Sequence, residues 1–120
     1  MRTLQDVLDE VARSSSESFV GARVDSVHSH RPCGETALHI VAKWGDAEAI
    51  DILIANGADI DKQGEDRNTP LHYAAMLGRL DAAKRLVELG AACLEDVYGN
   101  TPSQLAADPE VNRYLADRGF

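Results

Sequence analysis

A short segment of the chain combines three side chains that can bind a transition metal. His28, His30 and Cys33 follow an H-x-H-x-x-C spacing, and imidazole nitrogen and thiolate sulfur are ligands that zinc prefers. Zinc prefers four ligands, and no fourth is obvious, although Glu35 is close in sequence. A solvated loop explains the same residues without a metal. We therefore predict no metal and no cofactor, and keep a metal-binding or redox sensor as a second alternative function.

Two further histidines could act as general acids or bases, but their positions favour a structural role. His39 and His72 are 33 residues apart and end two similar tetrapeptides, TALH and TPLH. A repeated fold explains one histidine per repeat, whereas an active site does not require it. The chain carries no phosphate-binding loop, nucleophile elbow or H-E-x-x-H motif. We expect the acids of the turns to be solvated, and we predict a protein that is not an enzyme; these acids are Glu35, Glu65 and Asp66.

The sequence repeats itself with a period of 33 residues. TALH at 36–39 returns as TPLH at 69–72, and a third start, TPSQLAA, begins at Thr101. Identities at the same offset continue through the pairs Ala42 and Ala75, Gly45 and Gly78, Ala49 and Ala82, Leu53 and Leu86, Gly57 and Gly90, and Ala58 and Ala91. Such a period predicts a stack of similar supersecondary units.

Each period carries the start and stop signals of two short helices. A threonine can cap each first helix, and a proline often follows at the first helical position: Thr36, Thr69 with Pro70, and Thr101 with Pro102. We expect first helices at about 37–43, 70–77 and 102–107. A second helix with an apolar stripe follows each of the first two. Glycines at the expected helix ends are Gly45, Gly57, Gly78 and Gly90.

With these motifs the chain resembles the ankyrin-repeat family over roughly residues 24–120. The resemblance is carried by TALHIVAKWGD with IDILIANGADID, and by TPLHYAAMLGR with AKRLVELGAA, which match the T-P-L-H-x-A signature. It implies an all-α solenoid of about three helix–turn–helix repeats, with β-turn fingers and helical caps. We predict one domain, 1–120, with an irregular N-terminal cap at 1–30, repeats at 31–63 and 64–95, and a third repeat with the C-terminal cap at 96–120.

The resemblance also implies roles for individual residues. Motif positions are structural in the family, and here they are Thr36, His39, Gly45, Gly57, Thr69, His72, Gly78 and Gly90. Partners of the family dock on finger tips and on the exposed ends of first helices. The matching candidates for partner binding are Pro32, Cys33, Glu35, Lys43, Trp44, Glu65, Asp66, Asn68, Met76, Leu77, Val97, Tyr98 and Asn100. For Trp44 two interpretations stay open, an interface hot spot or packing against a neighbouring loop.

Two departures from the family pattern affect the fingers. Arg67 stands where the finger usually has glycine, and we expect Gly64 to take over the turn. The linker after the second repeat, which contains Ala91-Ala92-Cys93-Leu94, is one residue short. In it, Cys93 stands where the family usually has Val or Ile. We expect Cys93 to be a small buried hydrophobic residue.

Both ends carry the signals of capping helices. Thr3 and Asp6 resemble a capping pair, and the SSSES run at 14–18 should end the first helix. Its expected core face is Leu4, Val7, Leu8 and Val11. Asp108 with Pro109 should start the last helix, with Val111, Tyr114 and Leu115 facing inward. Because the chain begins with Met and ends just past this helix, we expect a complete small protein.

Composition limits the partner and the location. The net charge of −8 argues against nucleic acid and anionic membranes as partners, and permits a basic protein partner. The chain lacks a run of about 20 apolar residues, has no secretory signal and carries two cysteines, which predicts a location in the cytoplasm. We also expect a monomer. Nine Arg against three Lys indicates a GC-rich bacterial source. The predicted function is a non-catalytic protein–protein interaction module presenting a rigid concave surface; the first alternative is a dedicated inhibitor or immunity protein of a toxic enzyme.

Overall fold

The computed structural model describes residues 2–14, 27 and 34–120. Its helices are α1 (Leu4–Ser14), α2 (Ala37–Trp44), α3 (Ala47–Ala55), the 3-10 turn η1 (Glu65–Arg67), α4 (Pro70–Met76), α5 (Leu80–Glu88), α6 (Pro102–Leu105) and α7 (Pro109–Asp117). The predicted first helices are confirmed, with α6 shorter than expected. It ends early because the backbone at Ala106 is extended and α7 starts soon afterwards.

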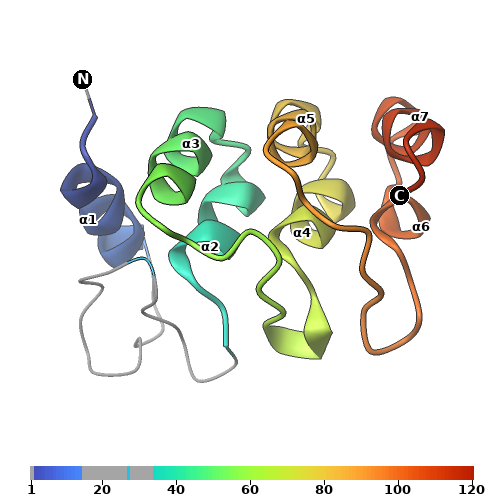
Figure 1. Ribbon diagram of the computed structural model, residues 1–120, viewed down its shortest axis with the longest axis horizontal. Coiled ribbons are helices and arrows are strands. Elements are labelled where there is room, and N and C mark those ends of the chain that lie inside the picture. Colours follow the sequence, from blue (N-terminus) through green and yellow to red (C-terminus); the bar gives the residue numbers. More distant parts are fainter. Residues whose placement is uncertain (1, 15–26, 28–33) are drawn as a thin grey trace.

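The helices form two parallel rows (Figure 1). Helices α2, α4 and α6 pack side by side in the first row, and α3, α5 and α7 do so in the second. Each first helix also packs against its own second helix, and α1 covers α2 and α3 at the N-terminal end. The connections between repeats extend as fingers beyond the first row, at the bottom of Figure 1. The predicted all-α solenoid is confirmed.

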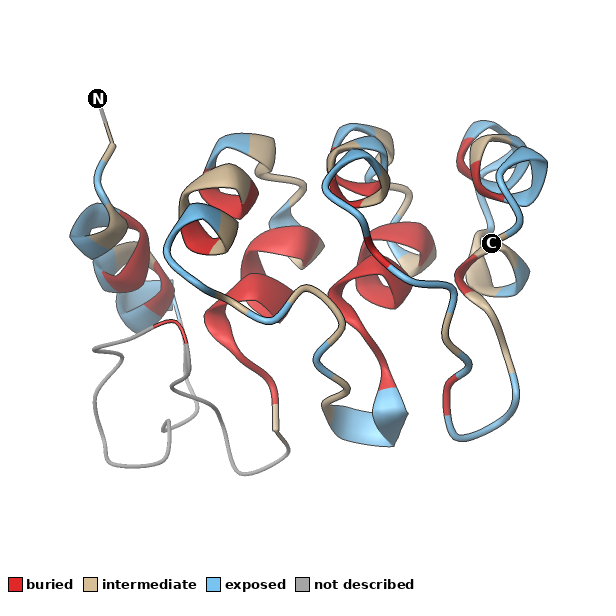
Figure 2. Cartoon of the chain, viewed as in Figure 1, coloured by how far each residue is buried: buried red, intermediate tan, exposed pale blue. Residues whose placement is uncertain are grey.

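The core lies between the two rows, and small side chains let the helices approach closely. Figure 2 shows the buried residues concentrated on α2 and α4. Leu38 and Leu71, the leucines of the two T-x-L-H motifs, are fully buried, as are Ile50, Leu53 and Leu86 of the second row. Alanines with no exposed surface line the same interfaces: Ala37, Ala42, Ala49, Ala74, Ala75, Ala82 and Ala83. A thin helix pair cannot bury this surface alone, so the repeats stabilise one another.

Both ends are closed by helices with the expected caps. At the N-terminal end, Thr3 N donates to Asp6 Oδ2 at 2.9 Å and Asp6 N donates to Thr3 Oγ1 at 3.2 Å. Arg2 then fastens α1 to the start of α3 by pairing with Glu10, Asp46 and Glu48. At the C-terminal end, Asp108 Oδ1 accepts the N–H of Glu110 at 2.8 Å. The inward sides of these helices are Val7, Leu8 and Val11, and Val111 and Leu115.

The second finger differs from the expectation for Gly64. Gly64 has an ordinary negative φ of −99°, whereas Asp66 and Arg67 adopt left-handed φ values of 53° and 61°. Arg67 therefore keeps the conformation that Gly34 and Gly99 adopt at the same place in the other fingers. Gly64 meets a different need, because a Cβ there would lie 3.3 Å from the backbone of Gly34 and of its neighbour. The first and second fingers approach so closely here that a Cβ at this position would be tightly packed against backbone atoms.

The expectation for Cys93 is also wrong, since this free thiol is exposed. Ala91 is the linker residue that turns inward, 8% exposed, and Ala92 N is held by Asp61 Oδ1 at 2.9 Å. These two contacts leave the next side chain directed to solvent. Among the helices of the described ranges, none has the length and apolar character needed to cross a bilayer.

Candidate partner-binding surface

Each motif histidine connects the start of its helix to the finger that follows. His39 Nδ1 accepts the N–H of Thr36 at 3.0 Å, so its ring proton is on Nε2. Nε2 then donates to the carbonyl oxygens of Lys62 and Asn68 at 2.8 and 3.1 Å. Burial lowers the pKa of His39, and these two carbonyl contacts partly oppose that shift. The ring is therefore a neutral connector.

His72 repeats this arrangement one repeat further on. Its Nδ1 accepts the N–H of Thr69 at 3.1 Å, and its Nε2 lies 3.0 Å from the carbonyl oxygen of Asn100. Burial again lowers the pKa, against the effects of the Asn100 carbonyl and the charge of Asp96. Both nitrogens of each ring therefore contact backbone groups, and each ring connects the start of its helix to the finger that follows.

A buried polar cluster lies where the first two repeats meet. Glu35 is only 2% exposed, and Lys43 Nζ lies 2.7 Å from its Oε1. The same Nζ lies 4.4 Å from the centroid of the Tyr73 ring. Burial raises the pKa of Tyr73, and the hydrogen bond to Glu35 with its negative charge adds to the increase. Asn68, which is 9% exposed, also contacts the Tyr73 side chain.

This cluster corrects two expectations. Glu35 is not a solvated turn residue, because packing of Tyr73 from the next repeat removes its carboxylate from water and Lys43 compensates the charge. Asn68 likewise turns inward, although no hydrogen-bond partner meets its Oδ1 among the described residues. Neither side chain can therefore form a major part of an exposed contact surface.

Exposed large apolar side chains lie at two places, the ends of the first-row helices α2 and α4 and the third finger. The helix-end surface comprises Lys43, Trp44, Met76 and Leu77, the last residues of α2 and the end of α4. Trp44 is 38% and Leu77 51% exposed, while Met76 is half-buried. The second place is the tip of the third finger, where Val97 is 51% and Tyr98 74% exposed. All four of these apolar residues, which were predicted to contact a partner, are therefore exposed to solvent.

The second and third fingers are joined into one platform. Val97 N donates to the carbonyl oxygen of Asp66 at 2.8 Å. Gln63 Nε2 donates to the carbonyl oxygens of Arg67 and Glu95 at 3.0 and 3.1 Å. The exposed side chains of this platform are the finger surface, which comprises Glu65, Asp66, Glu95, Val97 and Tyr98.

Asp96 shapes the third finger and was missed in the sequence analysis. It is 6% exposed, and its Oδ1 accepts the N–H groups of Tyr98 and Asn100, each at 2.9 Å. Asn100 is half-buried at the base of the finger. The signal was present as D-x-x-G in DVYG, because aspartate at the start of a turn bonds the backbone two residues on.

The remaining candidates lie outside the described residues. These are Pro32 and Cys33 of the first finger, and the possible metal ligands His28 and His30 with Cys33. Within the ranges that the structure does describe, no group of three or more His, Cys, Asp or Glu residues could hold a metal ion.

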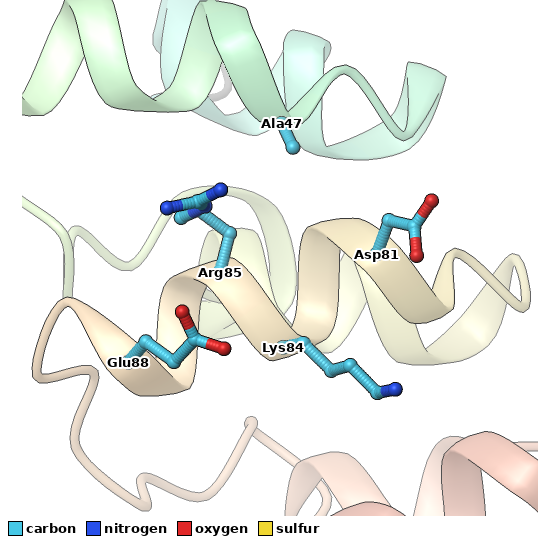
Figure 3. A pocket seen from close by; sticks show the side chains of 5 residues that line it. All are labelled: Ala47, Asp81, Lys84, Arg85 and Glu88. Carbon is cyan, nitrogen blue, oxygen red and sulfur yellow. The ribbon is translucent and has the colours of Figure 1, made fainter.

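Two shallow depressions lie on the opposite, second-helix side. One of about 290 Å³ lies between α3 and α5 and is lined by Ala47, Asp81, Lys84, Arg85 and Glu88. In Figure 3 Arg85 points toward α3, whereas Lys84 points away from it. Arg85 Nε also lies 3.5 Å from Asp51 Oδ1. The other, of about 330 Å³, lies between α5 and α7 around Tyr114. Charged, exposed side chains dominate both, which is typical of a solvated surface.

The fold and these contacts define a helical repeat protein whose repeats are connected by histidine-anchored fingers. A family model described as ankyrin repeats (3 copies) matches residues 12–95 and 56–120. The chain belongs to the ankyrin-repeat family. Ankyrin repeats are protein–protein interaction modules, and the chain is such a module.

Several curated proteins are similar to it. Protein phosphatase 1 regulatory subunit 27 of Mus musculus is 38% identical over 109 residues, covering 88% of this chain and 66% of the relative. Ankyrin repeat and SOCS box protein 11 of Homo sapiens is 36% identical over 85 residues, covering 68% and 26%. Neurogenic locus Notch protein of Drosophila melanogaster is 36% identical over 125 residues, covering 86% and 4%. The chain spans less than two thirds of each relative.

Proposed function

We propose that the chain binds a protein partner through the helix-end surface together with the finger surface. The observation that supports this is the distribution of exposed large apolar side chains. In the described ranges these are Trp44, Leu77, Leu89, Val97 and Tyr98, and all but Leu89 lie on the two surfaces. Exposed apolar groups that form a patch mark interaction sites, whereas singly scattered ones need no explanation.

The helix-end surface supplies the anchor of this interface. Trp44 and Leu77 hold equivalent positions in consecutive repeats, 33 residues apart, at the ends of α2 and α4, which pack side by side. Tryptophan is among the residues most enriched at interface hot spots. Because buried helices hold both residues in place, binding needs little reordering of the chain.

The proposal describes a monomer that acts in the cytoplasm without a metal or cofactor and catalyses no reaction. The similarity to a phosphatase regulatory subunit supports a regulatory role by binding. The metal or redox alternative depends on His28, His30 and Cys33, outside the described residues.

The test is partner capture with matched surface variants. The immobilised chain is exposed to a lysate of its source cells, bound proteins are identified by mass spectrometry, and the affinity of the purified partner is measured by calorimetry. Trp44→Ser with Leu77→Ser should weaken binding by about a hundredfold, as loss of hot-spot residues does. Leu89→Ser is the control, since Leu89 is comparably exposed at the end of α5.

Two outcomes of this test contradict the proposal. A partner whose affinity falls only in the Leu89 control binds elsewhere, and a partner that all variants bind equally uses neither anchor. If the captured partner is an enzyme whose activity the chain abolishes, the function becomes that of a dedicated inhibitor acting through the same surface.

A further inference from the structure

We infer that the finger surface recognises an arginine- or lysine-rich segment of the protein partner, and that the exposed ring of Tyr98 binds one of its cations. The inference rests on the proposed function and adds the chemistry of the partner. Three features of the described residues support it: the unneutralised carboxylates, the unoccupied tyrosine ring, and the hydrogen bonds that hold both in place.

The carboxylates of the finger surface form no ion pair with other described residues of the chain. Residues 59–68 and 92–100 contain six carboxylates and two cations. Asp59, Asp61 and Asp96 cap backbone N–H groups of the linkers and fingers. The other three side chains are exposed and make no ion pair among the described residues; they are Glu65, Asp66 and Glu95.

The cations of the neighbouring described residues do not neutralise the finger carboxylates. Lys43 is held 2.7 Å from the buried Glu35, so its charge is already compensated within the protein. The two cations of the second linker and finger, Lys62 and Arg67, are exposed and form no ion pair with the finger carboxylates. An approaching chain therefore meets a net negative surface, which attracts cations and repels acidic proteins and nucleic acids.

Two of the three tyrosine rings have a cation of the chain next to them, whereas the Tyr98 ring has none among the described residues. Lys43 Nζ lies 4.4 Å from the Tyr73 ring centroid. Tyr114 has Lys84 Nζ at 5.6 Å and Arg118 Cζ at 3.8 Å. Tyr98 is 74% exposed and has no such cation within the part of the chain that the structure describes. An aromatic face attracts ammonium and guanidinium groups within about 6 Å, so a cation from a partner can fill the position that the chain itself fills at the other two rings.

The platform is preorganised for such a segment. The bond from Val97 N to the Asp66 carbonyl at 2.8 Å joins the backbones of the two fingers at an exposed valine and an exposed aspartate. Lysine and arginine carry an aliphatic stem and a charged head, and Val97 can cover the stem while a carboxylate binds the head. Because arginine also stacks on rings and binds carboxylates with two N–H groups, an arginine-rich segment fits best.

The experiment titrates the whole 15N-labelled chain with two short peptides of equal length, one repeating Arg-Ala-Leu and one repeating Glu-Ala-Leu. We expect the arginine peptide to shift the amide signals of residues 63–68 and 95–100, with an affinity that falls as salt rises. Glu65→Lys with Glu95→Lys should weaken it by about tenfold or more. Glu88→Lys with Glu110→Lys changes the net charge equally on exposed second-row positions and should leave it nearly unchanged.

A third variant separates the ring from the charges. Tyr98→Ser should weaken the arginine peptide several-fold, by the loss of one cation–π contact, without changing the net charge. The spectrum of each free variant checks that the fold is kept, and Glu65→Gln with Glu95→Gln gives an intermediate loss without charge reversal.

The inference is overturned by equal losses in the finger and second-row variants, by peptide-induced shifts centred on α5 and α7, or by equal binding of the glutamate peptide. Its failure is distinct from failure of the proposed function. A partner that depends on Trp44 and Leu77, combined with no arginine-peptide binding at the fingers, leaves the proposed function standing and refutes only the partner chemistry.

Discussion

His72 Nε2 lies 3.0 Å from the carbonyl oxygen of Asn100, and through this contact α4 holds the base of the third finger. The third repeat offers a natural comparison, because Gln104 stands at the position of the motif histidine. Its Oε1 accepts the N–H of Thr101 at 2.8 Å, so glutamine supplies the helix cap. Only the imidazole ring supplies both the cap and the connection to the next finger.

His72→Gln should therefore preserve α4 and loosen the third finger. We expect a loss of about 1–2 kcal/mol in the free energy of unfolding, since one buried hydrogen bond and some packing disappear. Hydrogen exchange should become faster at residues 96–100, while residues 63–68 keep their protection. Urea unfolding and amide exchange measure the two effects, and unchanged exchange at 96–100 would show that the His72 contact does not hold the finger.

The two motif histidines should make the protein less stable below neutral pH. Burial keeps both folded-state pKa values below the ordinary value, so the unfolded chain binds protons first. Their contribution is complete above the unfolded pKa of about 6.5 and is lost as the pH falls toward the folded values. The carboxylates with lowered pKa, Asp6 and Asp46, titrate below this window.

The measurement compares urea midpoints at about pH 7.5 and about pH 5.5. The wild type should lose stability between them, and the variant His39→Gln with His72→Gln should lose less although it starts lower. Both proteins keep His28 and His30, so the difference isolates the motif rings. A variant with the full wild-type pH dependence would assign the effect to other groups.

The left-handed conformation of Arg67 gives a prediction about the sign of a substitution. Its φ is 61°, and left-handed backbone costs a non-glycine residue roughly 1–2 kcal/mol. Arg67→Gly relieves this cost, although glycine also gains freedom in the unfolded chain. We expect Arg67→Gly to be more stable than Arg67→Ala by about 0.5–1 kcal/mol, the reverse of the usual order. Thermal unfolding of the pair decides, and an alanine variant at least as stable as the glycine variant contradicts the conformation.

The buried register of the second row is testable at Leu53. Leu53 has no exposed surface, so Leu53→Ala should cost about 2–5 kcal/mol through lost burial and a cavity. Leu89→Ala, at a 39% exposed position, should cost about 0.5 kcal/mol or less. Chemical unfolding of both variants gives the comparison, and similar values for the two would contradict the packing of α3.

Helices and their caps could be predicted because their signals are local. Threonine, proline and glycine act within one turn of the backbone, so Thr69 with Pro70 indicates the start of α4 without knowledge of its neighbours. The fold then followed from the period. The close approach of Gly64 to the backbone of Gly34 could not be predicted, because it joins two fingers whose separation depends on how the repeats stack.

The direction of the finger side chains could not be predicted from the sequence either, because it also depends on how the repeats stack. Glu35 has the position of a surface acid, yet it is buried and contacts Lys43 and, from the next repeat, Tyr73. Cys93 has the position of a buried residue, and the short linker directs it to solvent. The period identifies a residue's place in the repeat, whereas contacts between repeats decide which way it faces.

The buried pair of Glu35 and Lys43 leads to the last prediction. Lys43→Met keeps the aliphatic stem and removes the ammonium group that lies 2.7 Å from the 3% exposed carboxylate. Loss of the ammonium group beside the buried carboxylate should cost about 1–3 kcal/mol, less than breaking a fully buried pair because the lysine is partly exposed.

The matched variant Glu35→Gln separates this charge effect from packing. If the penalty comes from loss of the positive charge beside the carboxylate, Glu35→Gln with Lys43→Met should recover much of the stability lost by Lys43→Met alone, because the buried negative charge is also gone. A double-mutant cycle of urea unfolding measures the coupling between the two side chains. Additive losses would mean that the two side chains do not stabilise each other. Strong coupling would mean that the Glu35–Lys43 pair holds the start of the first repeat to α2.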